Sequence, residues 1–250
     1  MKAAITAVER GHDVTLVEKS NSLGGMLKIS DYDPLKADMK AFKDYLVNRT
    51  LNMVKVRFNT EATPELIEKM APDVVLAAVG SSPIYPDIPG VKGKNVVVAE
   101  EAYCDVGKIG EKVAVIGGGL VGCEIGLYLT ALGKKVTIVE MRDAIGDPAD
   151  WRYTLPLITR MKETPNLQFN TSMNCLEITS SGIKVAAKNG KVQFIEADMV
   201  ILAAGRKPNT DTVENLRNCV PEFYPIGDCV KPQRIMEAMQ GGYFAALDIL

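Results

Sequence analysis

Three glycines in one short stretch have the spacing of a phosphate-binding turn. Gly117, Gly119 and Gly122 form the pattern G-x-G-x-x-G. In such a turn the first glycine makes a tight bend after a strand. The second lets the backbone approach a pyrophosphate, and the third lets a helix pack closely on the strand. The free N–H groups and the dipole at the helix N-terminus attract the phosphates. The spacing therefore predicts a dinucleotide-binding site.

The residues around these glycines supply the elements that such a turn requires. Val113–Ile116 is an apolar, mostly β-branched run that is typical of a buried parallel strand. A second strand, Lys135–Val139, leads into Glu140, 18 positions after Gly122 (140 minus 122). A carboxylate that binds ribose hydroxyls is expected at about this distance. The alternative is a glycine-rich turn of another α/β protein, and the preceding strand and the following acid make it the weaker interpretation.

Composition excludes several other classes of protein. The 250 residues carry a net charge of −2, which gives no electrostatic case for nucleic acid or for an anionic membrane as a partner. No apolar run is long enough to span a membrane. The single histidine, His12, lies in a polar turn, so histidine-dependent catalysis is not expected. The protein is expected to be cytoplasmic, because its five cysteines are odd in number and scattered. None has the C-x-x-C spacing of a redox disulfide or an iron–sulfur ligand.

The sequence contains an internal repeat. Met1–Lys19 aligns without a gap on Cys123–Met141, so that Glu18 matches Glu140 at an offset of 122 (140 minus 18). On this register the counterpart of Gly122 would lie immediately before Met1. We therefore expect the chain to begin inside the first helix of a second dinucleotide-binding unit whose first strand and glycine turn are missing. The hypothesis that follows is that the sequence is a piece of a longer protein.

Two further segments align with each other, and two short glycine-containing motifs could lie close to a ligand. Asp73–Pro83 aligns on Asp198–Pro208, which includes Gly205, at an offset of 125 (198 minus 73). Gly24 and Gly25 follow Glu18, and they predict either a backbone bend close to a ligand or a plain surface loop. Near the C-terminus, Asp228 follows Gly227 at a strand end. Its carboxylate could bind a polyol hydroxyl or cap a nearby helix.

The remaining pattern predicts an α/β fold with two Rossmann-like domains and an antiparallel β-meander. One domain, residues 109–212, is inserted in the other, residues 1–108 plus 213–250. Residues 84–110 are expected to form a hinge, and Asn189-Gly190 is expected to form a type I′ hairpin turn. The other expected helices are Pro34–Leu46, Pro64–Met70, Arg152–Lys162 and Ile235–Leu250, and the expected strands are Val54–Phe58, Leu167–Phe169, Asn174–Ile178, Ile183–Ala187, Lys191–Ile195 and Tyr224–Ile226.

Taken together, these motifs resemble the flavoprotein superfamily with two dinucleotide-binding domains, whose fold is that of glutathione reductase. The resemblance lies in Glu18 with Gly24-Gly25, then VGSSP, IPG, GGGLVGCE, AAGRKPN and YPIGDC in this order. More narrowly, the chain is similar to the C-terminal half of NADH:flavin oxidoreductases of the old yellow enzyme type. These include 2-enoate reductases, 2,4-dienoyl-CoA reductases and bile-acid-inducible reductases. In such proteins an N-terminal barrel carries FMN and a 4Fe-4S cluster.

The resemblance implies a role for each site residue. Residues 109–212 would bind NAD(P)H and the other domain FAD. For FAD, Glu18 would bind the adenosine ribose, Gly24 and Gly25 would line its path, and Gly227 and Asp228 would hold the ribityl chain or pyrophosphate. For the nicotinamide cofactor, Gly117, Gly119 and Gly122 would hold the pyrophosphate, Glu124 would face the nicotinamide and Glu140 would bind the ribose, with Gly205 near the cofactor. Because a carboxylate repels a 2′-phosphate, Glu140 favours NADH over NADPH, although Arg142 partly offsets this.

Three functions remain open at this point. The first is a hydride-transfer module that passes electrons from NADH through FAD to an FMN and iron–sulfur barrel where an enoate-type double bond is reduced. The second is a free-standing flavoprotein such as a disulfide reductase, which the lack of a cysteine pair disfavours. The third is a residual NADH-binding module without catalysis.

Overall fold

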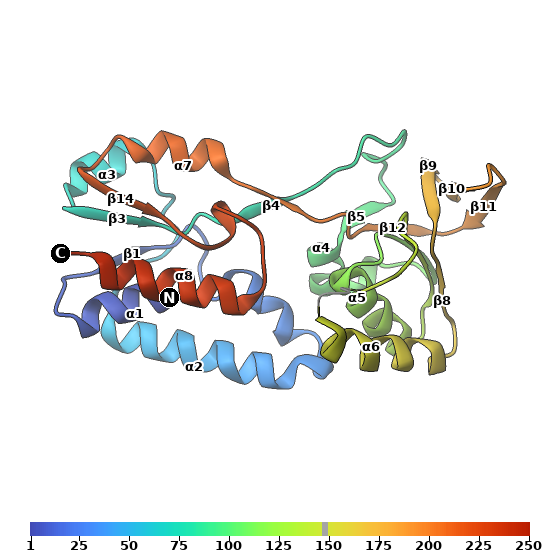
Figure 1. Cartoon of the computed structure of the whole chain (residues 1–250), viewed down its shortest axis with the longest axis horizontal. Helices are drawn as coiled ribbons and strands as arrows, with labels where there is room; N and C mark the ends of the chain where they lie inside the picture. Colours follow the sequence, from blue (N-terminus) through green and yellow to red (C-terminus); the bar gives the residue numbers. More distant parts are fainter. Residues whose placement is uncertain (147–149) are drawn as a thin grey trace. The chain divides into compact units, whose positions relative to one another are not determined.

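The chain forms two compact units in the computed structural model, which describes residues 1–146 and 150–250 (Figure 1). Unit 1 comprises Met1–Ser82 and Arg206–Leu250, and unit 2 comprises Pro83–Gly205. The expected insertion of one α/β unit in the other is confirmed, but the boundaries lie at residues 82 and 205 instead of 108 and 212. No helix in the described ranges is long and apolar enough to cross a membrane.

Unit 2 is built on a parallel sheet of five strands with β6 at its centre. β6 lies between β12 and β7, and its residues Ala114 and Val115 are fully buried. A strand buried on both faces must be apolar, which is why this run lacks the alternation of a half-exposed strand. The strand order is β5 (Val96–Val98), β12 (Met199–Leu202), β6 (Lys112–Ile116), β7 (Lys135–Val139) and β8 (Leu167–Asn170). The helices of this unit are α4 (Ala99–Cys104), α5 (Leu120–Ala131) and α6 (Trp151–Glu163), with a 3-10 turn, η3, at Val106–Lys108.

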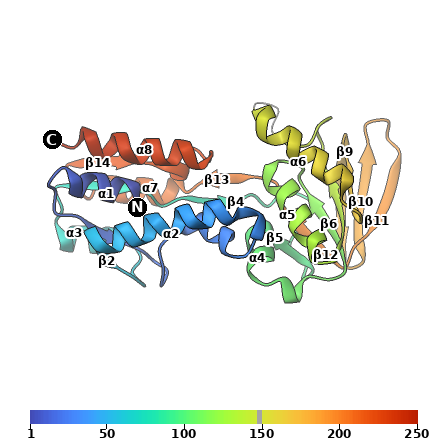
Figure 2. The same ribbon diagram turned by 90° about the horizontal axis from the view of Figure 1, so that it is seen from below.

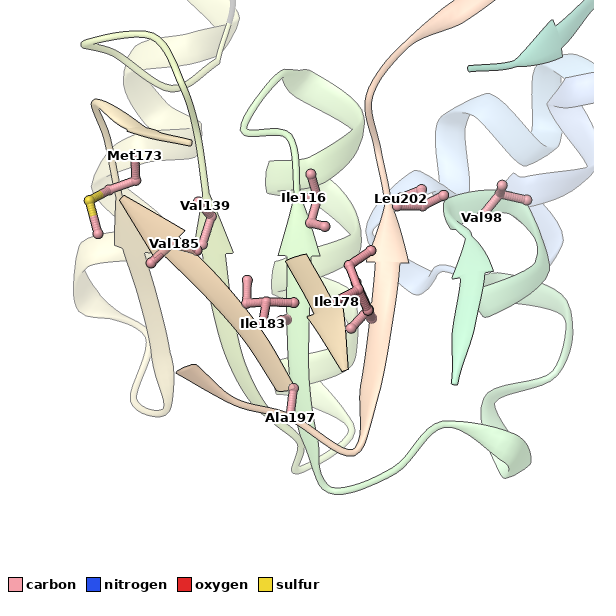
Figure 3. Packing of buried hydrophobic residues seen from close by; sticks show 11 residues of the cluster. Val98, Ile116, Val139, Met173, Ile178, Ile183, Val185, Ala197 and Leu202 are labelled. Carbon is pink, nitrogen blue, oxygen red and sulfur yellow. The ribbon is translucent and has the colours of Figure 1, made fainter. Parts of the chain in front are cut away.

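The expected meander is an antiparallel sheet of β9 (Met173–Thr179), β10 (Gly182–Ala187) and β11 (Val192–Glu196). Its residues Ile178, Ile183 and Val185 pack with the central parallel strands in one hydrophobic cluster (Figure 3). The expected type I′ turn is wrong, because only Gly190 has a positive φ and type I′ also requires one at Asn189. Instead the Gly190 N–H donates to Ala187 O and the Ala187 N–H to Lys191 O, which gives a three-residue loop.

The expected hinge over residues 84–110 is also wrong. This segment contains β5 and α4, and β5 pairs with β12 at the edge of the unit 2 sheet. Both prolines of the segment, together with Gly90 and Gly93, lie shortly before β5, and a strand of only three residues is difficult to recognise beside them. This strand pairing moves the domain boundary from residue 108 to residue 82.

Unit 1 contains two separate pairs of parallel strands. β1 (Thr15–Val17) pairs with β2 (Lys55–Arg57), and β3 (Val74–Ala77) pairs with β14 (Glu222–Pro225). The helices are α1 (Lys2–Glu9), α2 (Ala37–Met53), α3 (Pro64–Met70), α7 (Thr210–Arg217) and α8 (Ile235–Asp248), with 3-10 turns η1 (Gly25–Asp31), η2 (Pro34–Lys36) and η5 (Gly227–Cys229). α1 and α8 pack side by side through small residues, including Ala3 and Ala246 (Figure 2). The helix expected over Pro34–Leu46 instead starts with η2 and continues as α2 to Met53.

The repeat seen in the sequence recurs in the hydrogen bonds. After α1 the Gly11 N–H donates to Val8 O, and after α5 the Gly133 N–H donates to Thr130 O, both over 2.9 Å. Next the His12 N–H donates to Ala7 O, and the Lys134 N–H to Leu129 O, both over 3.1 Å. In both comparisons, the donor and the acceptor residue in unit 2 lie 122 positions after the corresponding residues in unit 1. The two units are therefore copies of one structural plan over this segment.

Candidate dinucleotide-binding sites

The glycine turn of unit 2 joins β6 to α5. Gly117 has a φ of +109°, and a Cβ there would lie 2.3 Å from Ala203 O. A Cβ on Gly122 would lie 1.9 Å from Gly117 O, so only glycine lets α5 start this close to the turn. Nothing lies within 4 Å of the Cβ position at Gly119, which therefore faces open space at the start of the helix. These three environments match the three roles of such glycines in pyrophosphate binding.

Glu140 lies beside this turn, at the end of β7, and only 5% of it is exposed. Its Oε2 accepts a hydrogen bond from the Gly118 N–H over 2.6 Å. Its Oε1 accepts from the Arg142 N–H over 2.8 Å and from Arg142 Nε over 3.0 Å. Burial disfavours the charged carboxylate, but the hydrogen bonds from Arg142 and Gly118 outweigh this and hold the pKa of Glu140 below its usual value. Glu140 thus stays ionised and fixes the glycine turn.

Glu124 and Gly205 lie elsewhere in unit 2. Glu124 is on α5, and its Oε1 accepts a hydrogen bond from the Tyr153 hydroxyl of α6 over 2.7 Å. Gly205 ends the segment after β12 with a φ of +96°, and its carbonyl accepts from the Ile84 N–H over 3.0 Å. Gly205 therefore shapes the backbone where the chain leaves unit 2. Tyr153 was not expected from the sequence, because no local pattern connects α6 with Glu124.

In unit 1, Glu18 occupies the position of Glu140. Its Oε1 accepts hydrogen bonds from the Ser20 N–H over 2.8 Å and from the Ser20 hydroxyl over 2.7 Å. Lys28 Nζ donates to the same hydroxyl over 3.1 Å. Gly24 precedes η1 with a φ of +120°, so the bend expected at Gly24 and Gly25 is present. Next to it lies a cavity of about 320 Å³ lined by Ser22, Lys28 and Lys43 among others.

Asp228 follows Gly227 in η5, and both of its carboxylate oxygens have partners. Oδ2 accepts from the Ser81 hydroxyl over 3.2 Å, and Oδ1 accepts from the Gln233 N–H over 3.4 Å. The second contact lies just before α8, so Asp228 binds the approach to that helix. Arg206 Nε donates to the Ser81 hydroxyl over 2.8 Å. Burial lowers the pKa of Arg206, while the negative charge of Asp228 opposes this.

Neither Ser81 nor Arg206 was expected from the sequence to be a site residue. The repeat contained the signal, because the offset of 125 aligns Ser81 with Arg206 and Gly80 with Gly205. The Asn209 N–H donates to Gly80 O, just as the Ile84 N–H donates to Gly205 O. Equivalent positions of the two copies thus meet where β4 (Ser81–Pro83) pairs with β13 (Arg206–Pro208). The alignment marks Ser81 and Arg206 as equivalent positions, and their contact is seen only in the structure.

All five cysteines are free thiols. Cys123 and Cys229 are buried, and burial raises the pKa of Cys123 to about 11. A thiol with so high a pKa is a poor nucleophile at neutral pH.

Comparisons with known proteins agree with this arrangement. Residues 1–242 match the family described as pyridine nucleotide-disulphide oxidoreductase. An NADH oxidase of Thermoanaerobacter brockii is 36% identical over 100% of this chain and 39% of its own length. A cinnamate reductase of Clostridium sporogenes is also 36% identical, over 100% of this chain and 37% of its own length. A solved complex of 2-naphthoyl-CoA reductase with 2-naphthoyl-CoA superposes with a TM-score of 0.93. It is 32% identical and covers 99% of this chain and 38% of its own. The chain thus spans less than two fifths of these relatives.

Proposed function

The chain belongs to the pyridine nucleotide-disulphide oxidoreductase family, and from this premise we propose that it is a module for hydride transfer from NADH to FAD. Unit 2 binds NADH and unit 1 binds FAD. When both are bound, the nicotinamide supplies a hydride and the flavin accepts it. The single observation that carries this proposal is the glycine turn of unit 2, with Glu140 hydrogen-bonded to it.

The glycine turn fits a pyrophosphate. The open space at Gly119 lets phosphate oxygens reach the backbone N–H groups at the start of α5. α5 has twelve residues, and its positive N-terminal end attracts anions. Gly117 and Gly122 hold this helix end in place. Glu124, the fifth residue of α5, orients the nicotinamide end, and the Tyr153 hydroxyl bound to it fixes the direction of its carboxylate.

Glu140 sets the choice of nicotinamide cofactor. Its ionised carboxylate accepts hydrogen bonds from ribose hydroxyls and repels a 2′-phosphate. Arg142 would favour a 2′-phosphate, but its Nε is bound to Glu140 Oε1, which reduces this effect. We therefore infer that NADH is preferred over NADPH.

In unit 1, Glu18, Gly24, Gly25, Gly227 and Asp228 are the residues proposed to hold FAD. Glu18 binds the adenosine ribose by analogy with Glu140, and Lys28, which donates to the Ser20 hydroxyl beside Glu18, is proposed to bind a phosphate. The Ser81–Arg206 pair holds Asp228 toward the flavin. The protein's part in the reaction is to orient the two rings and to exclude water.

We also propose where the electrons go after FAD. The relatives named cinnamate reductase and 2-naphthoyl-CoA reductase are reductases of unsaturated acids or their thioesters by name, and this chain spans only part of each. We infer that a barrel with FMN and a 4Fe-4S cluster, in an upstream domain or subunit, receives the electrons and reduces an enoate-type double bond. The proposed setting is the cytoplasm, with no role for nucleic acid or a membrane.

One observation favours a second candidate, an NADH-binding module without catalysis. In unit 1, β1 and β2 pair apart from β3 and β14, whereas the five parallel strands of unit 2 form one sheet. A free-standing disulfide reductase is not supported by the buried, high-pKa thiol of Cys123.

An absorbance titration separates the two candidates. The purified chain is saturated with FAD, freed of excess flavin, and then titrated with NADH without oxygen. Hydride transfer predicts a bound flavin band that NADH bleaches and NADPH bleaches less. A colourless protein that still binds NADH would support the second candidate, and a protein that binds neither cofactor would refute both.

A further inference from the structure

The antiparallel meander of unit 2 has two outer strands, and their outer sides differ. On β9, the Met173 N–H donates to Glu140 O over 2.9 Å, and the Ile178 N–H donates to Pro89 O over 2.8 Å. β11 is the other outer strand, because β10 lies between it and β9 (Figure 1). Within the described residues, no strand pairs with the outer side of β11. This side is called the β11 edge.

Three residues of β11 turn their backbone groups toward this edge. The Ala197 N–H donates to Ser181 O over 3.0 Å, so the backbone groups of Ala197 face the β10 side. Because these groups alternate in direction along an antiparallel strand, those of Val192, Phe194 and Glu196 face away from β10. In the part of the chain that the structure describes, they have no partner strand. Unpaired N–H and C=O groups in a row are a template for another strand.

The side chains at the β11 edge also favour pairing. Val192 is 48% exposed and Phe194 is 50% exposed, and both lie on the same face of the strand. Natural edge strands are usually protected by lysine, by proline or by a bulge. β11 contains neither lysine nor proline, and its register with β10 is regular, whereas the register of β10 with β9 shifts. β11 therefore lacks the features that keep an edge strand unpaired.

The charges around β11 are divided between its two ends. Lys188 and Lys191 are exposed before the strand, and Glu196 and Asp198 are exposed at its end and just after it. An antiparallel strand of the same sequence brings its acidic end to the basic end of the first copy. A parallel strand of the same sequence would bring like charges together, which opposes pairing. The charge pattern is therefore complementary to a second copy of β11 in antiparallel orientation.

We propose that the β11 edge is a homodimer interface, in which β11 of one copy pairs antiparallel with β11 of a second copy around a two-fold axis at Phe194. In this register the two Phe194 residues lie opposite each other, and Val192 lies opposite Glu196 of the second copy. Each opposed pair exchanges two backbone hydrogen bonds. The two meanders, with three strands each, become one continuous sheet. Such a two-fold dimer is closed, because each copy uses the same edge.

The interface stands apart from the proposed NADH site. Lys112 Nζ donates to Glu196 Oε2 over 2.6 Å, and Lys112 is the first residue of β6. The glycine turn follows Ile116, at the other end of β6. Dimerisation therefore does not depend on hydride transfer, and NADH affinity is an independent measure of whether a variant is folded.

Sedimentation velocity of the whole chain between about 1 and about 200 µM tests the dimer, because a small interface of this kind corresponds to a Kd of roughly 10 µM. The wild type should change from monomer to dimer over this range. Phe194→Lys places two positive charges opposite each other at the two-fold axis, so the dimer Kd should rise at least about tenfold. The matched control is Leu155→Lys, which changes an exposed leucine on α6 and should dimerise as the wild type does.

The backbone hydrogen bonds are tested separately with Val192→Pro. The Val192 N–H faces away from β10, and edge strands tolerate proline at such a position. In the dimer the substitution removes the N–H that donates to Glu196 O of the second copy. The dimer Kd should rise at least about tenfold while the NADH affinity stays unchanged. If this variant does not fold, Phe194→Lys and hydrogen exchange of the wild type still decide the question.

Hydrogen exchange identifies the surface directly. The Phe194 and Glu196 amides should exchange at least about tenfold more slowly at the highest concentration than at the lowest. The Gln193 and Ile195 amides face β10 and should be protected equally at both concentrations.

Three results would overturn the proposal. The first is a chain that stays monomeric at the highest concentration. The second is a dimer that Phe194→Lys leaves unchanged and in which the Phe194 amide is unprotected, because that dimer uses another surface. The third is protection of the Phe194 amide already in the monomer, which means that another segment of the same chain covers the β11 edge.

Discussion

Glu140 combines two tasks in one buried side chain: it holds the Gly118 N–H and is the proposed ribose acceptor. Replacing it by Gln keeps its size and removes its charge. We expect the Kd for NADH to rise about tenfold, which corresponds to the loss of one charge-assisted hydrogen bond of about 1.4 kcal/mol. The Kd for NADPH should rise less or fall, because the repulsion of the 2′-phosphate is removed. Fluorescence titration measures both constants, with Glu163→Gln on the exposed end of α6 as the control. Unchanged values for both cofactors would remove Glu140 from the site.

The same carboxylate predicts a pH dependence of stability. The pKa of Glu140 is lowered in the folded protein from a reference value of 4.5, so its ionised form binds Arg142 and Gly118 more favourably than the unfolded chain can. This contribution is fully present above the unfolded pKa and is lost as the pH falls through the lower, folded pKa. The difference in free energy of unfolding between the wild type and Glu140→Gln should therefore shrink below pH 4.5. Urea unfolding from neutral pH downward measures it. A difference that stays constant over this range would contradict the assignment.

Two glycines of the turn that joins β6 to α5 have different roles, one in cofactor binding and one in packing. At Gly119 an added Cβ meets nothing within 4 Å, whereas at Gly122 it meets Gly117 O at 1.9 Å. Gly119→Ala should therefore change stability by less than about 0.5 kcal/mol but weaken NADH binding roughly tenfold, because the new methyl group occupies the pyrophosphate position. Gly122→Ala should push α5 from β6 and cost about 1–3 kcal/mol. Thermal unfolding and NADH titration of both variants measure these effects. Equal NADH affinity in wild type and Gly119→Ala would show that the turn does not hold the pyrophosphate.

The elements that sequence reasoning located well are those whose pattern is local. β7 and α3 have the expected bounds. β7 coincides with a largely apolar run, and α3 starts at a proline followed by glutamate. β5 was missed because three valines among prolines and glycines resemble a connection. Its identity as a strand depends on β12, about a hundred residues later in the chain. The loop at Asn189-Gly190 was assigned the wrong type for a similar reason, since its length is set by the register of β10 and β11.

The site residues show the same limit. Gly117 and Glu140 could be found from spacing alone, because the turn and the next strand are adjacent in sequence. Tyr153, Ser81 and Arg206 could not, since their partners are distant in sequence and are brought close only by the fold. Such pairs are found only from the structure.

Unit 2 is one continuous segment of the whole molecule, so it can be produced without unit 1. Its two ends meet, because the Ile84 N–H donates to Gly205 O over 3.0 Å, and its parallel sheet is complete within Pro83–Gly205. A domain with its own core and adjacent termini can fold alone. We expect residues 83–205, expressed alone, to unfold cooperatively and to bind NADH with a Kd within about threefold of the full chain, a difference of roughly 0.6 kcal/mol. Isothermal titration and urea unfolding measure both properties, and the same segment with Gly119→Ala is the control. A folded segment that has lost NADH affinity would mean that residues of unit 1 contribute to the nicotinamide site.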